Sequence, residues 1–311
     1  MPEHVEVRLP DDVCLHVEAT GPADAEVTVV LLHGWTLDGR AWHRQLADLR
    51  ERFDGAVRVV TYDARGHGRS SCMALPTATL AQLGDDLAAV LDEVAPDGRV
   101  VLAGHSMGGM TIMEYAHRHP EHFAARAAGL VFVSTTAEGH THTAYGLSPR
   151  IARLIRLAET TGAGVLARCG SWRPPRALLR ALRPSIRWML FGDRCDPHDI
   201  RLVTSAVARA SLRSIGGFRA SIGAQHRLDT LARLAHLPAA ALVGDRDRLT
   251  PPPCAESIAA VLPATELTVC PGAGHMLMME RPAEVNAALG GVLRQVLADA
   301  RSAAPTTTRK G

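Results

Sequence analysis

The sequence lacks several features that would place the protein in a special class. It has no uninterrupted apolar stretch of about 20 residues, the length needed to span a bilayer, because an arginine, aspartate or glutamate interrupts each candidate run. Its N-terminus has neither the basic start nor the apolar segment of a secretory signal. We therefore expect a cytoplasmic protein without a transmembrane segment.

The sequence also has few cysteines and a small net charge. The six cysteines stand singly, without the paired spacing of a zinc site or the density of a disulfide framework. The formal net charge is only +2 over 311 residues, so no global field favours nucleic acid or an anionic membrane. Phosphate-binding glycine loops and dinucleotide fingerprints do not occur in the strand-to-helix context that they need. These absences predict no metal, no cofactor and no nucleic-acid partner.

What the sequence does contain is a repeated alternation of strand-like and helix-like segments. Its 47% hydrophobic content is enough to bury a large core. β-branched runs separated by helical stretches are typical of a mainly parallel sheet covered by helices, so the expected class is α/β with eight strands. The first two strands flank a turn and form an antiparallel hairpin. The expected strands are residues 4–9, 13–19, 27–32, 57–62, 100–103, 129–133, 239–243 and 266–270.

Residues 136–236 interrupt this alternation. They contain arginine-rich, helix-like segments with glycine and proline breaks and no clear strand. We expect an inserted helical cap there, between a first part of the core at residues 1–135 and a second part at 237–300. Residues 301–311, rich in alanine, threonine and proline, are expected to form a disordered tail.

The first helix of the expected cap begins at Ser148 and Pro149. Serine is a favoured N-cap residue, and proline is favoured in the first turn of a helix. Its apolar side consists of Ile151, Leu154, Ile155 and Ala158. Arginines recur through the cap, and two interpretations stay open for them: a site for an anionic substrate or interface, or a solvated face opposite the apolar stripe.

The most specific motif is Gly-His-Ser-Met-Gly-Gly at residues 104–109, which follows an expected strand and opens an expected helix. A nucleophile on such a tight turn has a strained backbone, and glycines remove the side chains that would clash there. We therefore predict that Ser106 is a nucleophile.

A serine hydroxyl is a poor nucleophile at neutral pH and needs a neighbouring base. Two later loops supply candidates, since residues 244–251 contain Asp245 and Asp247, and residues 271–275 end in His275. Both loops follow strands whose ends meet at the same sheet edge as the serine. We predict His275 as the base and Asp247 as the acid that orients it, with Asp245 as a turn-forming neighbour and the alternative acid.

The developing oxyanion needs two backbone N–H donors, one of which usually comes from the residue after the nucleophile. Met107 occupies that position, and Trp35 follows a strand and the turn at Gly34. We predict that these two amides form the oxyanion hole. The side chains of Met107 and Trp35 either line the acyl pocket or pack in the core.

The chain resembles the α/β-hydrolase family in four blocks that occur in order. They are residues 33–35, 63–70, 104–109, and 244–251 together with 274–275. The resemblance implies the α/β-hydrolase fold, a structural role for residues 63–70, and a serine esterase or lipase. Its substrate would be a small-molecule ester with an apolar acyl chain, cleaved through an acyl-enzyme. Relatives that hydrolyse epoxides or haloalkanes use an aspartate nucleophile, so Ser106 disfavours those activities.

Several alternatives share these residues. Cofactor-free haloperoxidases, which can form peracids, have the same Ser, Asp and His set and the same string at 104–109. Acyl transfer to an alcohol or amine would use the same chemistry, and a receptor or binding module of the same fold would keep the residues without turnover. Carbon–carbon bond hydrolases share the triad too, but the sequence shows no clear tryptophan and arginine signature for them.

Overall fold

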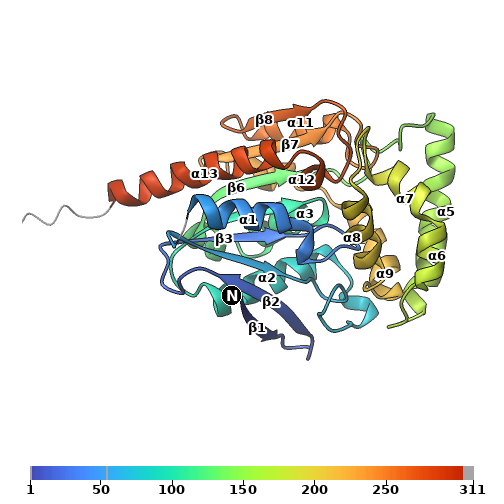
Figure 1. Cartoon of the computed structure of the whole chain (residues 1–311), viewed down its shortest axis with the longest axis horizontal. Coiled ribbons are helices and arrows are strands. Elements are labelled where there is room, and N and C mark those ends of the chain that lie inside the picture. Colours follow the sequence, from blue (N-terminus) through green and yellow to red (C-terminus); the bar gives the residue numbers. More distant parts are fainter. Residues whose placement is uncertain (1, 54, 304–311) are drawn as a thin grey trace, which may run out of the picture.

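Within the described residues, eight strands form one sheet in the order β1-β2-β4-β3-β5-β6-β7-β8 (Figure 1). The computed structural model describes residues 2–53 and 55–303. The strands β1, β2 and β4 pair antiparallel, and the pairs from β4 through β3 to β8 are parallel. This confirms the predicted α/β class and its mostly parallel sheet. The strands are β1 (Glu3–Arg8), β2 (Cys14–Thr20), β3 (Val27–Leu32), β4 (Val57–Tyr62), β5 (Arg99–His105), β6 (Ala127–Val133), β7 (Ala239–Gly244) and β8 (Glu266–Cys270).

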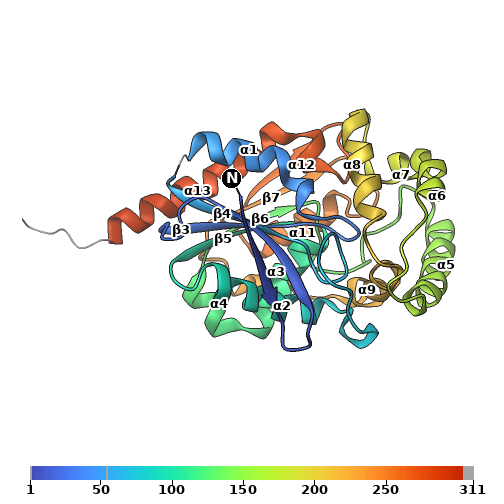
Figure 2. The ribbon, with the colours of Figure 1, turned by 60° about the horizontal axis from the view of Figure 1, so that its bottom comes forward.

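Helices cover both faces of the sheet, which explains why the central strands are continuous apolar runs rather than alternating ones. Every residue of β3, β4, β6 and β7 is buried. In β3, Val30 and Leu32 pack with α2 (Leu80–Val94) and α3 (Met107–Arg118), whereas Val29 and Leu31 pack with α1 (His43–Arg52) and α13 (Pro282–Ala303). Figure 2 shows the two helical layers on either side of the sheet.

Shorter helices complete the core. The sequence predicts a helix that stops before Pro120, and α3 does end at Arg118, but a second helix, α4 (Pro120–Arg126), follows at once with the proline in its first turn. Proline is well tolerated there because the first N–H groups of a helix have no partner within it. The others are α11 (Pro252–Val261), α12 (Leu277–Glu280) and the 3₁₀ turns η1 (Gly39–Trp42) and η2 (Leu75–Thr77).

Charged side chains of the loop at residues 63–70 form hydrogen bonds that fix its position in the structure. The Asp63 carboxylate accepts backbone N–H groups of Gly39 and Arg69, both at 2.8 Å. The guanidinium of Arg65 is fully buried and donates two hydrogen bonds of 2.6 Å to Asp86. The charged groups of this loop therefore bind backbone N–H groups, as Asp63 does, or pair with a carboxylate outside the loop, as Arg65 does.

Residues 136–236, here named the cap segment, lie between β6 and β7 and contain six helices. α5 packs closely on α9, which also contacts α2 of the core. Figures 1 and 2 both place α5, α6 and α7 on the side of the molecule away from the free end of α13. The helices are α5 (Pro149–Arg168), α6 (Arg176–Ala181), α7 (Arg183–Leu190), α8 (Pro197–Val207), α9 (Leu212–Ala224) and α10 (Leu228–Ala232).

The C-terminal end differs from the expected disordered tail at residues 301–311. The helix α13 continues to Ala303, so residues 301–303 are helical, while 304–311 lie outside the described residues. None of the described helices combines the length and the apolar character of a membrane span.

Candidate active site

Ser106 lies at the tip of the turn between β5 and α3. Its backbone has φ 51° and ψ −117°, a region that costs a non-glycine residue roughly 1–3 kcal/mol. The turn is held from both sides, because the Ser106 N–H donates to the carbonyl of Val133 at 3.0 Å and the Ser106 carbonyl accepts the Thr135 hydroxyl at 2.7 Å. The surrounding structure thus stabilises a conformation that the isolated chain would avoid.

The glycines of the motif allow this turn because backbones meet there. A Cβ at position 108 would lie 2.7 Å from the carbonyl carbon of Leu32 in β3. A Cβ at position 34 would lie 3.2 Å from the Cβ of Ser106, so the Gly34 backbone is placed directly against the serine. These close approaches bring the end of β3 to the Ser106 turn.

The imidazole of His275 is held by a buried carboxylate. Asp247 lies 2.9 Å and 3.1 Å from His275 Nδ1 through its two oxygens, and both side chains are buried. The Thr250 hydroxyl donates to Asp247 at 2.9 Å, as do the backbone N–H groups of Leu249 and Thr250. Burial alone would raise the pKa of Asp247, but the His275 ring and these donors outweigh it and hold that pKa below its usual value.

The neighbouring Asp245 has a different place. Its carboxylate is exposed and accepts the N–H of Gly272 at 2.7 Å. Asp245 therefore fixes the turn that leads into the histidine loop, and Asp247 is the carboxylate that contacts the imidazole.

His105, the residue before Ser106, joins the serine turn to the histidine loop. Its Nε2 donates to the carbonyl of His275 at 2.9 Å, and the two ring centroids are 4.8 Å apart. Burial lowers the pKa of His105 to about 3, so its ring is neutral. Together these contacts bring Ser106, His275 and Asp247 to the carboxyl edge of β5, β8 and β7.

The cap segment also forms hydrogen bonds with the loop that carries His275. The N–H groups of His275 and Met276 donate to the carbonyl of Leu190, at the end of α7, at 2.8 Å and 3.1 Å. Glu280 accepts the N–H of Gly192 at 2.8 Å and that of Gly274 at 3.0 Å. Burial raises the pKa of Glu280 to about 7. Sequence reasoning missed these contacts, because Leu190 and Gly192 lie far along the chain from the histidine loop; Gly192 and Glu280, for example, are 88 positions apart.

A cavity of about 70 Å³ opens at Ser106. Trp35 and Met107, the residues predicted to supply the oxyanion hole, both line it. Most of the polar side chains that line it come from the cap segment, and we name His140, Tyr145, Glu159 and Arg219 the polar wall. The other lining residues are Met110, Thr136, Gly139, His140, Thr143, Tyr145, Glu159, Arg219, Ile222, Leu249 and Thr250.

The polar wall is one hydrogen-bonded cluster. Arg219 donates to Glu159, to His140 and, at 2.9 Å, to the hydroxyl of Tyr145, which itself donates to Glu159 at 2.6 Å. Burial raises the pKa of Tyr145 well above its usual value, and burial and then the Arg219 charge lower that of His140 to about 4. The wall therefore presents a neutral imidazole, a phenol and one compensated ion pair.

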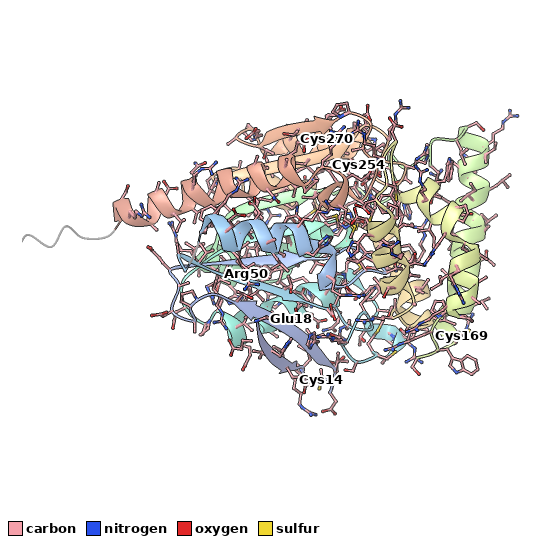
Figure 3. The ribbon with its side chains drawn as sticks, viewed as in Figure 1. Cys14, Glu18, Arg50, Cys169, Cys254 and Cys270 are labelled. Atoms are coloured by element: carbon pink, nitrogen blue, oxygen red, sulfur yellow. The ribbon has the colours of Figure 1, made fainter. Side chains whose placement is uncertain are left out.

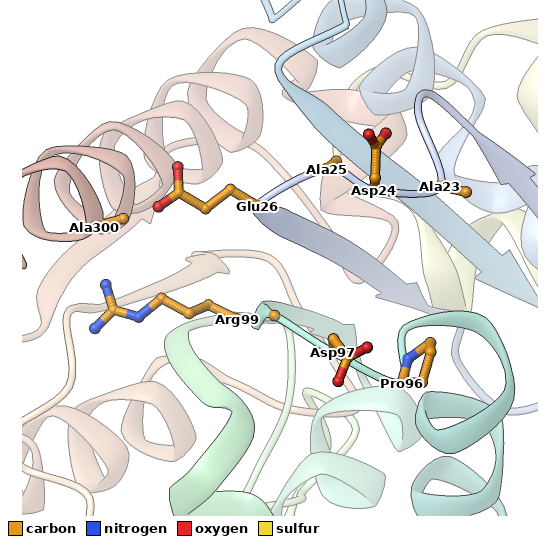
Figure 4. A pocket seen from close by; sticks show the side chains of 9 residues that line it. Ala23, Asp24, Ala25, Glu26, Pro96, Asp97, Arg99 and Ala300 are labelled. Carbon is orange, nitrogen blue, oxygen red and sulfur yellow. The ribbon is translucent and has the colours of Figure 1, made fainter. Parts of the chain in front are cut away.

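A wider hollow of about 850 Å³ lies at the opposite end of the sheet (Figure 4). Its walls come from the chain entering β3 and β5, and Glu26 and Arg99 extend toward Ala300 on α13. The described residues that line it include no serine, cysteine or histidine. Its ionisable groups are the carboxylates of Asp24, Glu26 and Asp97 and the guanidinium of Arg99, so it lacks the serine found in the small cavity at Ser106.

Within the part of the chain that the structure describes, two groups of side chains have the composition of a metal site. One is His4, His16 and Glu18, and the other is His43, His198 and Asp199. Their acidic members already have cationic partners, since Arg69 pairs with Glu18 and Arg44 with Asp199, each at 3.0 Å. Neither group lines the cavity at Ser106, so we assign no ion to them.

Comparison with known proteins agrees with this architecture. A profile described as "Alpha/beta hydrolase family" matches residues 29–288. A protein provisionally named carbamate hydrolase RutD, from Variovorax paradoxus, is 31% identical over 91% of this chain and 97% of its own length. The solved structure of a thermophilic esterase from Thermogutta terrifontis is 27% identical, with a TM-score of 0.72 over 94% of this chain and 99% of that one. A bifunctional esterase/perhydrolase from Acinetobacter calcoaceticus is 37% identical over 38% of this chain and 40% of its own.

Proposed function

The chain belongs to the α/β hydrolase family, and from this premise we propose that it is a serine hydrolase that cleaves carboxylic esters through an acyl-enzyme on Ser106. The observation that carries the proposal is the buried Asp247 carboxylate on His275 Nδ1, at 2.9 Å, on the same sheet edge as the strained Ser106. A carboxylate in that place orients an imidazole so that its Nε2 is available as a base.

In the proposed cycle, His275 takes the hydroxyl proton of Ser106 as the oxygen attacks the substrate carbonyl. The backbone N–H groups of Met107 and Trp35 stabilise the oxyanion. His275 then protonates the leaving alcohol, and an acyl-enzyme remains. Water, deprotonated by His275, attacks the acyl carbonyl and releases the acid and free Ser106. Asp247 stabilises the imidazolium in both halves.

The cavity supports a small acyl group. A volume of about 70 Å³ accommodates only a few heavy atoms, and the apolar side chains of Met107 and Met110 are among those that line it. The acyl chain would therefore be short and apolar. At the polar wall, Tyr145 and Arg219 offer hydrogen-bonding groups to a polar end of the substrate.

A second candidate reaction is carbamate hydrolysis. It is favoured by the similarity to the protein named carbamate hydrolase RutD over almost its whole length, and by the polar wall that could meet a carbamate nitrogen. Perhydrolysis and acyl transfer would use the same acyl-enzyme, with peroxide or an alcohol in place of water.

The decisive experiment is fluorophosphonate labelling followed by mass spectrometry, with p-nitrophenyl esters of rising chain length and a p-nitrophenyl carbamate as substrates. We expect an adduct on Ser106, turnover of short esters, and loss of turnover in Ser106→Ala and His275→Ala. Adding hydrogen peroxide or an alcohol and measuring the product ratio separates hydrolysis from perhydrolysis and acyl transfer. An adduct elsewhere, or a folded protein that is neither labelled nor active, would replace this proposal with the binding-module alternative.

A further inference from the structure

The outer side of the cap segment exposes an unusual number of large apolar side chains. We name the set of α5, α6, α7 and the connections between them, residues 149–190, the outer cap surface. Of the ten exposed large hydrophobic side chains among the described residues, eight lie on this surface and only Leu75 and Val269 lie elsewhere. The eight are Ile151, Leu154, Leu157, Val165, Trp172, Leu178, Leu182 and Trp188.

The helix α5 shows why these side chains point outward. Its inner face is made of small residues, with Ala152, Ala163 and Ala167 buried, and α9 approaches so closely that a Cβ on Gly216 would clash with the α5 backbone. Leu154 and Leu157 come from the other side of the helix and are 67% and 65% exposed. The predicted apolar stripe of this helix is therefore largely turned away from the core, and its apolar area has no partner within the described residues.

Positive charge accompanies the apolar side chains. Residues 149–190 contain nine arginines, one glutamate and no aspartate, although the whole chain carries a formal charge of only +2. The single acid, Glu159, is bound to Arg219 of α9. Among residues 2–53 and 55–303, none of the nine arginines forms an ion pair with a carboxylate. The basic charge of the chain is thus concentrated on this surface and uncompensated there.

We propose that the outer cap surface docks onto an anionic lipid surface. Leucine and tryptophan side chains on helices that also carry arginine are typical of segments that lie in the interface of a membrane, with the apolar groups in the headgroup and acyl boundary and the cations on lipid phosphates. Trp172 is 76% exposed and fits the level of the headgroups. A second copy of the chain fits less well, because face-to-face docking would bring two sets of unpaired arginines together.

Docking in this orientation would set the cap toward the membrane and leave the free end of α13 away from it (Figures 1 and 2). The helix α5 carries the exposed apolar stripe and also contributes Glu159 to the lining of the cavity at Ser106. The proposal concerns binding alone and does not depend on the reaction at Ser106.

The test is flotation of the full chain with two kinds of vesicle, one of phosphatidylcholine and one of equal parts phosphatidylcholine and phosphatidylglycerol. We expect binding to the anionic vesicles that weakens as salt is raised. Each arginine removed should weaken partitioning about fivefold, so Arg150→Gln with Arg153→Gln is expected to lose about 25-fold. Leu154→Gln with Leu157→Gln should lose at least about tenfold.

Matched variants outside the surface give the controls. Arg50→Gln with Arg301→Gln removes two exposed arginines, of which Arg50 lies on α1 away from the cap helices (Figure 3), and Val269→Gln removes an exposed apolar group on β8. These variants should bind vesicles like the parent protein. A blue shift of tryptophan fluorescence on anionic vesicles should decrease in Trp172→Phe and disappear when Trp188→Phe is added, since both side chains lie on the outer cap surface.

Three results would overturn the proposal. They are no binding to either vesicle, equal binding by the cap and control variants, and equal affinity for neutral and anionic vesicles. Sedimentation velocity provides a further check, because a dimer that dissociates in the Leu154→Gln, Leu157→Gln variant would assign the surface to self-association instead. Circular dichroism of each variant shows that a loss of binding is not a loss of fold.

Discussion

The carbonyl oxygen of Leu190 accepts a hydrogen bond from the N–H of His275 at 2.8 Å. Leu190 ends the cap helix α7, so the cap segment contacts the backbone of the proposed base directly. Beside it, Glu280 bridges the N–H groups of Gly192 and Gly274. The position of the imidazole therefore depends on cap residues as well as on the sheet, and the first prediction concerns this bridge.

Glu280→Gln should change how stability varies with pH. The pKa of Glu280 is raised to about 7 in the folded protein, from 4.5 in the unfolded chain, so the folded state binds the proton more tightly. Its contribution to stability is fully present below the unfolded pKa and is lost as pH rises through about 7. The parent protein should thus lose about 2 kcal/mol relative to Glu280→Gln between about pH 5 and pH 8.

Urea unfolding of both proteins across that pH range measures the effect. The other titrating groups are common to both, so the difference between the two curves reports on position 280. Parallel curves would show that Glu280 stays ionised throughout.

Asp247→Asn should lower kcat by about 10⁴-fold with little change in KM, because an amide cannot fix the required tautomer of His275 or stabilise its charged form. Asp245→Asn is the matched control, two residues away in the same loop. The Asp245 carboxylate contacts the Gly272 N–H and the guanidinium of Arg246 but not the imidazole of His275, and Asp245→Asn should retain activity within a few-fold. Steady-state kinetics on a short p-nitrophenyl ester gives both values, and comparable losses in the two variants would contradict the assignment of the acid.

The Ser106 turn and the Asp247 loop could be proposed from the sequence because each follows a strand with a buried apolar run, whereas β8, which precedes His275, carries the polar residues Glu266 and Thr268. In β3, β6 and β7 a continuous apolar run marks strands covered on both faces, and Ser106, Asp247 and His275 follow the neighbouring strands β5, β7 and β8 at the carboxyl edge of the same sheet. Glycines that are required by close backbone approach, such as Gly108, added a second local signal.

Contacts made by the cap segment could not be predicted in this way. Glu159 and Arg219 are 60 residues apart, on helices whose packing angle no local pattern encodes. The stripe formed by Ile151 and Leu154 has the spacing of a core-facing helix side, but α5 packs through its alanines and exposes these residues. Periodicity identifies an apolar side of a helix, but it does not say what covers that side.

The polar wall provides a prediction about both stability and binding. Arg219→Met should destabilise the protein by about 3–5 kcal/mol, because it leaves Glu159 as an unpaired charge beside the cavity. Since Glu159 is partly exposed, the lower end of that range is expected. Adding Glu159→Gln should restore most of the loss, as the charge is then removed from both partners. Equal stability of the single and double variants, measured by urea unfolding, would show that the pair is not coupled.

The same double variant should discriminate between substrates. If Tyr145 and Arg219 bind a polar end of the substrate, then kcat/KM for a short ester with a terminal hydroxyl or amide falls more than tenfold relative to the unsubstituted ester. Tyr145→Phe should show the same direction with a smaller change. An unchanged ratio between the two esters would limit the wall to a structural role.

The last prediction compares two glycines that both lie in α-helices. Gly108 lies in the first turn of α3, where a Cβ would press on the Leu32 backbone, whereas Gly162 lies within α5 with open space where its Cβ would be. Gly108→Ala should therefore cost about 1–3 kcal/mol of stability and lower activity, since α3 must move away from β3 and carry Ser106 with it. Gly162→Ala should instead raise stability by up to about 1 kcal/mol through its helix propensity and leave activity unchanged. Thermal unfolding measures the stability of the two variants, and ester turnover measures their activity. If Gly108→Ala changes neither, the close approach of β3 and α3 does not constrain the serine turn.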